Sequence, residues 1–224
     1  GKNDLEKKVY TLKSTSEAMR LRNDILERLE MASIEPDHAK QRSMLNFVVI
    51  GAGPTGVEIA GALGEMKRYI IPRDYPSLYP DMLSISVIEG SDRVLATMSD
   101  SASDKAKEYL EDLAVDLHLS TTMTDYDTVN GTVCCSDGSA ISASMVIWTA
   151  GVTAVPFEFI GHDVETGRGH RIAVDRYNRL PGIDGVYAVG DICIMTEDPK
   201  FPAGHPQLAQ VAIQQAVTLA GNLN

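Results

Sequence analysis

Three glycines carry the clearest chemical signal in the sequence. They follow the apolar run 47–50 with the spacing G-x-G-x-x-G, and a helix start comes with them. In such a strand-turn-helix the first glycine permits the tight turn, the second lets backbone N–H groups approach a pyrophosphate, and the third lets the helix pack against the strand. The residues expected to bind a dinucleotide phosphate are Gly51, Gly53, Pro54, Thr55 and Gly56.

An acidic residue, Glu89, ends the next predicted strand. A carboxylate there can accept both adenosine ribose hydroxyls and repels a 2′-phosphate, which predicts a preference for NADH over NADPH. The spacing from Gly51 is 38 residues (89 − 51), against about 20 in the usual motif. We expect the proline-containing segment 69–83 to be a surface insertion that accounts for the difference. Arg93 is close enough in sequence to weaken this preference for NADH. In the alternative interpretation, Glu89 is only a solvated acid at the end of the strand.

Glu58 lies early in the helix that follows the glycines. In one interpretation its carboxylate is simply stabilised by the helix dipole, by about 0.3–1 kcal/mol. In the other it accepts a hydrogen bond from an amide NH₂, and a nicotinamide carboxamide offers that donor. The residue types alone leave both interpretations open.

Two further candidates lie near the C-terminal end. An apolar run at 185–189 is predicted to be a short strand, and it ends in Gly190-Asp191, which places a carboxylate where open α/β sheets bind ligands. Residues 208–216 are predicted to form a helix with Gln210 and Gln214 on one face. Glutamine pairs on helices are usually solvated.

The elements that must position these residues follow from hydrophobic periodicity. The pattern indicates an α/β fold, a Rossmann-like parallel sheet with an antiparallel β-meander. Strands are expected at 46–50, 85–89, 115–119 and 145–148, with meander strands around Val129, Val133 and Ile141 joined by turns at 130–131 and 137–138. Helices are expected at 15–32, from the turn at 35–37 to about 45, from 54 to about 68, and from Asp100 or Ser101 onward.

Composition limits the classes of function. The 224 residues are 44% hydrophobic and 23% charged, as in ordinary globular proteins, and the net charge of −11 argues against nucleic acid as a partner. No apolar run approaches the roughly 20 residues that span a bilayer. The first eight residues lack the apolar core of a signal peptide, so we expect a cytoplasmic location. The three cysteines, of which Cys134 and Cys135 are adjacent, predict neither a disulfide nor a metal site.

Four segments together resemble type II NADH dehydrogenase from about residue 10 to the end. They are the glycine motif continued to Leu63, Val146-Ile147-Trp148-Thr149-Ala150-Gly151-Val152, residues 186–191, and Ala209-Gln210-Val211-Ala212-Ile213-Gln214. Members of that family are single-chain NADH:quinone oxidoreductases that carry FAD, lie on the membrane periphery and pump no protons. The resemblance implies hydride transfer from NADH to FAD, followed by transfer of two electrons to quinone, at the cytoplasmic face of the inner membrane.

The resemblance also implies roles for individual residues. The three glycines would hold the NADH pyrophosphate, and Glu89 the adenosine ribose. Gly151 would bring backbone against the cofactor, and Asp191 would contact FAD. The residues implied to take part in catalysis are Glu58 near the nicotinamide, and Gln210 and Gln214 beside the flavin ring and the quinone pocket.

The family pattern is incomplete in this sequence, which contains no second G-x-G-x-x-G and no C-terminal amphipathic anchor. We therefore expect a fragment, with membrane contact made only by a missing C-terminal region. Its expected parts are a helical segment at 1–45, an NAD(H)-binding domain at 46–151 and the returning part of an FAD domain at 152–224. Such a fragment should hold no FAD tightly and should lack quinone reductase activity, and its exposed apolar surface could support a homodimer.

Two alternatives to the quinone oxidoreductase remain. The first is a reductase with another acceptor, such as a disulfide, sulfide or ferredoxin. The second is a non-catalytic NAD(H)-sensing module. An FAD motif encoded upstream would argue against the sensing module, and the Ala209 to Gln214 element argues against a disulfide reductase.

Overall fold

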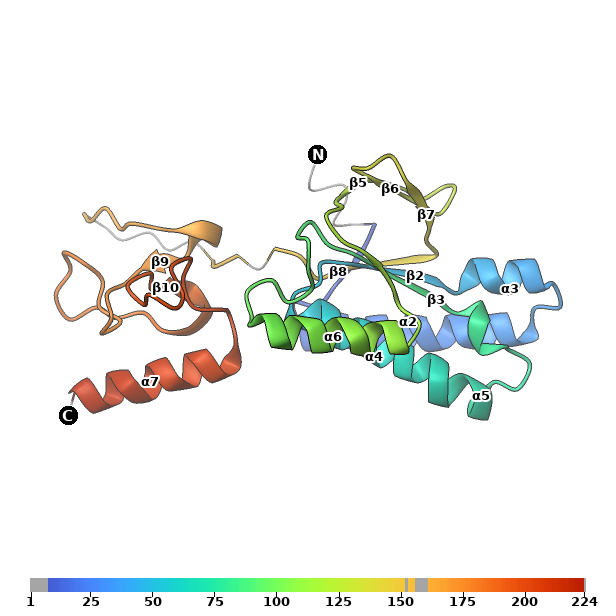
Figure 1. Ribbon diagram of the computed structural model, residues 1–224, viewed down its shortest axis with the longest axis horizontal. Coiled ribbons are helices and arrows are strands. Elements are labelled where there is room, and N and C mark those ends of the chain that lie inside the picture. The colour runs from blue at the N-terminus through green and yellow to red at the C-terminus, as the bar shows by residue number, and fades with distance from the viewer. Residues whose placement is uncertain (1–7, 152, 156–160, 224) are drawn as a thin grey trace. The chain divides into compact units, whose positions relative to one another are not determined.

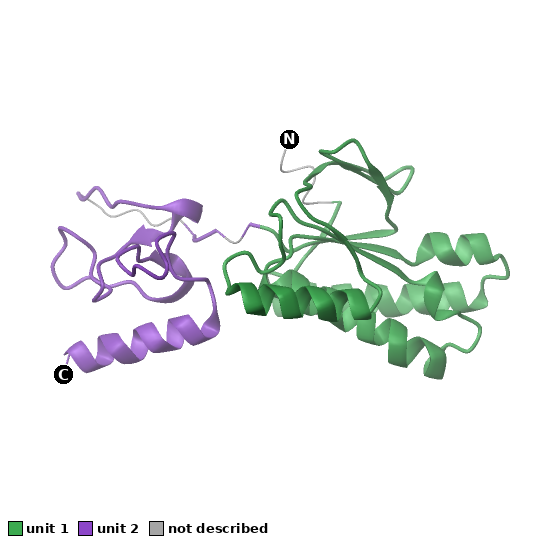
Figure 2. Cartoon of the chain, viewed as in Figure 1, with its two compact units in different colours: residues 1–150 green, residues 151–224 purple. Residues whose placement is uncertain are grey.

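The computed structural model describes residues 8–151, 153–155 and 161–223. The chain divides into two compact units, Gly1–Ala150 and Gly151–Asn224 (Figure 2). They are called unit 1 and unit 2 below, and each is described by itself.

Unit 1 is built on a five-stranded parallel sheet (Figure 1). Ile50, at the end of the central strand, pairs with Trp148 on one side and Ile88 on the other, so three strands end at the same edge. The strands, in the order β1-β8-β2-β3-β4, are β1 (Tyr10–Thr11), β8 (Met145–Trp148), β2 (Asn46–Ile50), β3 (Ser84–Ile88) and β4 (Asp116–His118).

The two faces of this sheet bury alternate residues of the same strands. Phe47, Val49 and Ile147 pack in one apolar cluster with the helices, whereas Val48 and Val146 pack in a second with the antiparallel strands. Burial on both faces explains why these strands are continuous apolar runs. The longer helices of this unit are α2 (Thr15–Ile34), α3 (His38–Met44), α4 (Pro54–Glu65) and α6 (Asp100–Asp112).

Three antiparallel strands form the expected meander, β5 (Met123–Asp127), β6 (Thr132–Cys135) and β7 (Ala140–Ser142). The turns at 130–131 and 137–138 are confirmed. The strand expected around Val129 is wrong in position, because Val129 lies in the first turn with 91% of its surface exposed. An apolar residue in that turn gave a misleading strand signal.

The surface insertion expected at 69–83 is also wrong. After α4 the chain continues through the π-helix η1 (Met66–Ile70) into α5 (Ile71–Asp74), then η2 (Pro80–Met82). The N–H of Ile71 donates to the carbonyl of Met66, and Pro72, which lacks an N–H, then falls in the first turn of α5, where none is needed. Apolar side chains of this segment are buried in the core, among them Ile71, Tyr75, Leu78, Met82 and Leu83.

Unit 2 has little regular structure before its last helix. Its elements are η3 (Arg168–His170), β9 (Ile172–Ala173), η4 (Gly190–Ile192), β10 (Cys193–Ile194) and α7 (Ala209–Leu223), and β9 pairs with β10 in parallel. Within the described residues, its apolar core is the cluster of Ile172, Val174, Leu180, Ala188 and Cys193, all of them buried.

The strand expected at 185–189 does not form. Tyr187 makes only an isolated bridge with Arg179. Gly185 and Gly190 have φ angles of +74° and +75°, so the chain turns at both ends of this run instead of extending. The expected helix is present but extends further, as α7 continues to Leu223.

Candidate functional site

The glycine turn joins the end of β2 to α4, at the edge where three parallel strands end. Gly51 has φ +99°, and its N–H donates to the carbonyl of Ile88 at 2.8 Å. A Cβ at position 51 would lie 3.0 Å from the backbone of Ala150. Both the backbone conformation and the space therefore require glycine.

Gly56 brings the first turn of α4 against this loop. A Cβ at position 56 would overlap the carbonyl oxygen of Gly51 and lie 2.8 Å from Oγ1 of Thr149. The Thr149 hydroxyl lies 2.9 and 3.0 Å from the carbonyl oxygens of Ile50 and Gly51, to which it can donate. Sequence reasoning gave Thr149 no role of its own, although it belongs to the segment that carried the resemblance.

Gly53 is open where the other two glycines are crowded. A Cβ there would meet no atom within 4 Å, and its φ of −70° is one that any residue adopts. Gly53 is the N-cap of α4, with Pro54 and Thr55 following, and no side chain caps the helix. The free N–H groups, the helix dipole and the open space fit a phosphate or pyrophosphate.

Glu89 follows β3, and its half-buried carboxylate is already bonded to the turn. Its Oε2 accepts from the N–H of Ala52 at 2.6 Å, and its Oε1 accepts from the N–H of Ser91 at 2.8 Å. Each carboxylate oxygen has two lone pairs, so one remains on each. The carboxylate can therefore accept two further donors, such as a pair of neighbouring hydroxyls.

The other expected residues of unit 1 are less constrained. Glu58 is exposed in the second turn of α4, and no bond to its carboxylate is found among the described residues. The guanidinium of Arg93 is engaged with Asp100 and with the carbonyls of Ala96 and Met98. Gly151, at the start of unit 2, is exposed with φ +75°.

In unit 2, Asp191 is exposed within η4, and η4 contacts α7. Gln215 of α7 is buried, and its Oε1 accepts from the N–H of Gly190 at 2.7 Å. A Cβ at Gly190 would lie 3.2 Å from Cβ of Ala212, so helix and turn approach closely. Gln210 and Gln214 are both exposed on α7. The sequence singled out these two glutamines and missed the buried one beside them.

Buried polar groups surround the Gly190 turn. The Cys193 thiol lies 3.3 Å from the carbonyl of Gly190 and 3.6 Å from Oε1 of Gln215, and burial raises its pKa. Nε of Arg171 donates to the carbonyl of Cys193 at 2.7 Å. Burial lowers the pKa of Arg171, which stays charged because an arginine pKa is far above neutrality.

The candidate residues thus form two groups. Residues 51–56 and Glu89 come together in unit 1, with Glu58 further along α4, and Asp191 lies on the turn that α7 contacts in unit 2.

The cysteines of the described residues are all free, and those residues hold no cluster of metal-binding side chains. Within the same ranges, no helix is long and apolar enough to cross a bilayer. A hollow of about 420 Å³ beside Arg176 and Glu197 lies among none of the predicted site residues.

The sequence is similar to known oxidoreductases. Residues 3–216 match the model of the family described as pyridine nucleotide-disulphide oxidoreductase. A type II NADH:quinone oxidoreductase of Mycobacterium tuberculosis is 32% identical over 92% of this chain and 43% of its own length. An external alternative NAD(P)H-ubiquinone oxidoreductase of Arabidopsis thaliana is 28% identical over 86% of this chain and 34% of its own length. The chain spans less than half the length of these relatives.

Solved structures share the fold. NDH2 from Plasmodium falciparum in complex with NADH superposes with a TM-score of 0.69 at 23% identity, over 86% of this chain and 41% of that one. A ferredoxin reductase from Rhodopseudomonas palustris superposes with a TM-score of 0.64 at 19% identity, over 95% of this chain and 45% of that one. With its strand-turn-helix glycine motif and a family match over nearly its whole length, the chain belongs to the pyridine nucleotide-disulphide oxidoreductase family.

Proposed function

We propose that this chain is the NADH-binding part of a flavin-dependent NADH:quinone oxidoreductase. The observation that carries the proposal is the open, uncapped α4 N-terminus at Gly53, with the Glu89 carboxylate bonded to the same turn. This arrangement suits a pyrophosphate next to a ribose. The names of the M. tuberculosis relatives support NADH as donor and quinone as acceptor.

In this proposal unit 1 binds and orients NADH. The N–H groups at the start of α4 hold the pyrophosphate, and the two remaining lone pairs of Glu89 accept the adenosine ribose hydroxyls. Glu58 accepts from the nicotinamide carboxamide, and Gly151 brings backbone against the cofactor. We assign residues 46–151 to the NAD(H)-binding domain and residues 1–45 to a helical segment packed on it.

Residues 152–224 are assigned to the returning part of an FAD-binding domain. Its exposed groups suit that role, with the Asp191 carboxylate contacting FAD and the amides of Gln210 and Gln214 bordering the flavin and the quinone. FAD, when bound, supplies the chemistry of accepting a hydride and passing on electrons. The chain itself contributes position and hydrogen bonds.

The choice of quinone as acceptor rests on the curated relatives, because the fold alone does not select it. A ferredoxin reductase and the reduced CoADR-RHD of Bacillus anthracis superpose almost as well, with TM-scores of 0.64 and 0.65. Membrane association at the cytoplasmic face and homodimer formation stay predictions.

Titration calorimetry with NADH and NADPH tests the binding site. We expect NADH to bind more tightly, and Gly53→Ser to weaken NADH binding by about 10- to 100-fold, because the new side chain fills the phosphate space and competes for the N–H groups. Serine is a favoured N-cap, so the stability of the fold should be unchanged or higher. Equal affinity for NADH in Gly53→Ser would refute the phosphate site.

Variants of Glu89 test the ribose contact. Glu89→Ala should remove the preference for NADH, but it also leaves the N–H groups of Ala52 and Ser91 without their acceptor. Glu89→Gln keeps one acceptor oxygen and is the better-matched variant. Equal affinities of the unaltered chain for NADH and NADPH would contradict the assignment of Glu89.

A further inference from the structure

The loop between β3 and α6 is tied to the glycine turn at two points. Glu89 accepts from the N–H of Ala52, and the N–H of Leu95 donates to the carbonyl of the same residue at 2.8 Å. Arg93 lies between these two points. Its backbone is therefore held beside the position where the ribose is proposed to bind.

The guanidinium of Arg93 makes three contacts, one with Asp100 at the start of α6 and two with carbonyls of this loop. Its Nη1 forms an ion pair with Asp100, and its Nη2 donates to the carbonyls of Ala96 at 3.1 Å and Met98 at 3.2 Å. Asp100 is the first residue of α6, where the helix dipole favours a negative charge. Asp100 thus offers Arg93 a fixed carboxylate that competes with any other anion.

We propose that Asp100 is a specificity-determining residue that keeps Arg93 from binding the 2′-phosphate of NADPH. This inference rests on the proposed function. A guanidinium is the side chain that best recognises a phosphate, and one placed near the ribose acid is how this fold accommodates a 2′-phosphate. In this chain the same guanidinium is paired internally, so Glu89 meets the ribose without a neighbouring free cation.

The expected effect is modest, for two reasons. The side chain of Asp100 is 88% exposed and that of Arg93 is 34% exposed, so solvent weakens the ion pair. The two carbonyl bonds also remain after Asp100 is changed. Loss of the pair should therefore raise NADPH affinity by about two- to fivefold and leave NADH affinity unchanged.

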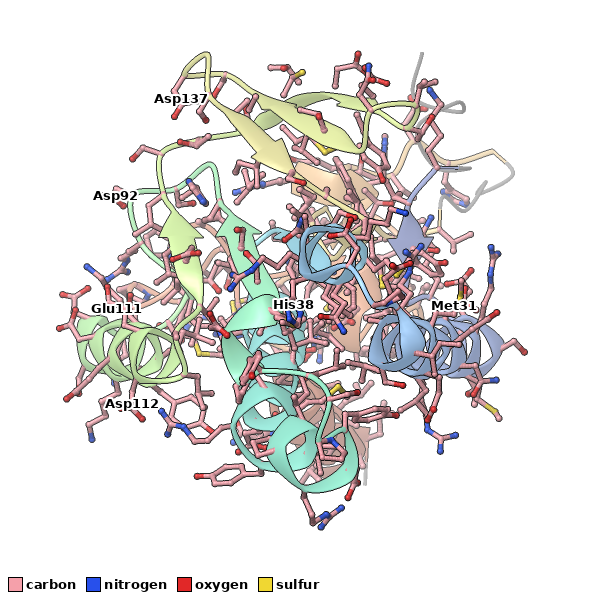
Figure 3. The ribbon with its side chains drawn as sticks, turned by 90° about the vertical axis from the view of Figure 1, so that its right-hand side faces the viewer. Met31, His38, Asp92, Glu111, Asp112 and Asp137 are labelled. Carbon is pink, nitrogen blue, oxygen red and sulfur yellow. The ribbon has the colours of Figure 1, made fainter. Side chains whose placement is uncertain are left out.

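The test compares Asp100→Asn with Asp92→Asn in calorimetric titrations of the whole chain with both nucleotides. Asp92, which is exposed (Figure 3), is the matched control. It precedes Arg93 in the chain, and no bond to it is found among the described residues. Asp100→Asn should gain NADPH affinity, and Asp92→Asn should not. An equal gain in both variants would reduce the effect to net charge and overturn the proposal.

Arg93→Gln completes the cycle. On its own it should leave NADPH affinity unchanged, and in the Asp100→Asn background it should remove the gain, whereas a gain that persists without Arg93 contradicts the proposal. Ser99 caps α6 through the N–H of Ala102, so Asp100→Asn should fold, which circular dichroism and thermal melting check. If the unaltered chain binds NADH and Asp100→Asn changes nothing, only this inference fails; if the unaltered chain binds neither nucleotide, the proposed function fails with it.

Discussion

Units 1 and 2 hold their candidate residues in place by different physical means. In unit 1, strands of up to five residues are buried on both faces, and Gly51 and Gly56 are set by backbone contacts at the edge of the sheet. In unit 2 the paired strands are two residues long, and buried side chains fix the turns through hydrogen bonds to backbone, among them Arg171, Asn178 and Gln215. A hydrophobic sheet positions the first group, whereas single polar side chains position the second.

The largest effect on stability is expected at Gly56, because a side chain there would run into the backbone of the turn. Gly56→Ala should lower the free energy of unfolding of unit 1 by at least about 3 kcal/mol, because its Cβ meets the Gly51 carbonyl, a backbone atom that cannot move aside cheaply. Trp148 is the only tryptophan and lies in β8, so denaturant unfolding followed by its fluorescence reports on unit 1. Gly53→Ser, in the same turn, is the control. If Gly56→Ala is as stable as the unaltered chain, the turn can shift to make room for the added Cβ, and the prediction is wrong.

A smaller effect is expected at Gln215. Gln215→Ala removes the acceptor for the N–H of Gly190, and should destabilise unit 2 by about 1–3 kcal/mol. Gln214→Ala, at the neighbouring exposed position, should change stability by no more than about 0.5 kcal/mol. Hydrogen exchange at Gly190 and Ala188 measures both. Equal protection in the two variants would mean that the apolar cluster alone holds unit 2 together.

The smallest effect is expected with rising pH. Burial raises the pKa of Cys193 above its ordinary value of 9.0, so the folded chain keeps the thiol neutral while the unfolded chain ionises. This contribution to stability is complete below about pH 8.5 and is lost as the pH rises toward the folded pKa. Burial likewise raises the pKa of Tyr75 and Tyr126 in unit 1 above 10.0. The pH-dependent loss of stability should therefore begin at lower pH in unit 2 than in unit 1.

The pH comparison can be checked by following hydrogen exchange of unit 2 and Trp148 fluorescence from pH 7 to 10.5. Cys193→Ala should remove the part of the pH dependence of unit 2 that begins above about pH 8.5. Simultaneous opening of both units, or a Cys193→Ala profile identical to that of the unaltered chain, would contradict this assignment.

The sequence predicted the elements whose constraints are local. Gly51 was recognisable because a turn with positive φ against Ala150 leaves no other residue type. The burial of β2 and β8 on both faces was likewise predictable, since such a strand must be apolar throughout. The roles that the resemblance implies for Glu58, Asp191, Gln210 and Gln214 stay predictions.

Other features depend on contacts between distant segments. Which of the adjacent residues Gln214 and Gln215 is buried depends on how α7 packs on η4, and the pattern of α7 alone does not decide it. The run at 185–189 has strand composition but pairs at only one residue, Tyr187. The proline at 72 suggested a surface loop, because the π-helix that accommodates it has no sequence signature of its own.

The bonds of Glu89 to Ala52 and Ser91 have a further consequence, which concerns entropy. A free glutamate side chain loses about 1.5–2 kcal/mol of rotamer freedom when it is fixed in one orientation. Here folding imposes that loss before any nucleotide arrives, so association itself need not order the carboxylate. Shortening the side chain in Glu89→Asp would break both bonds and return the cost of ordering to the binding step.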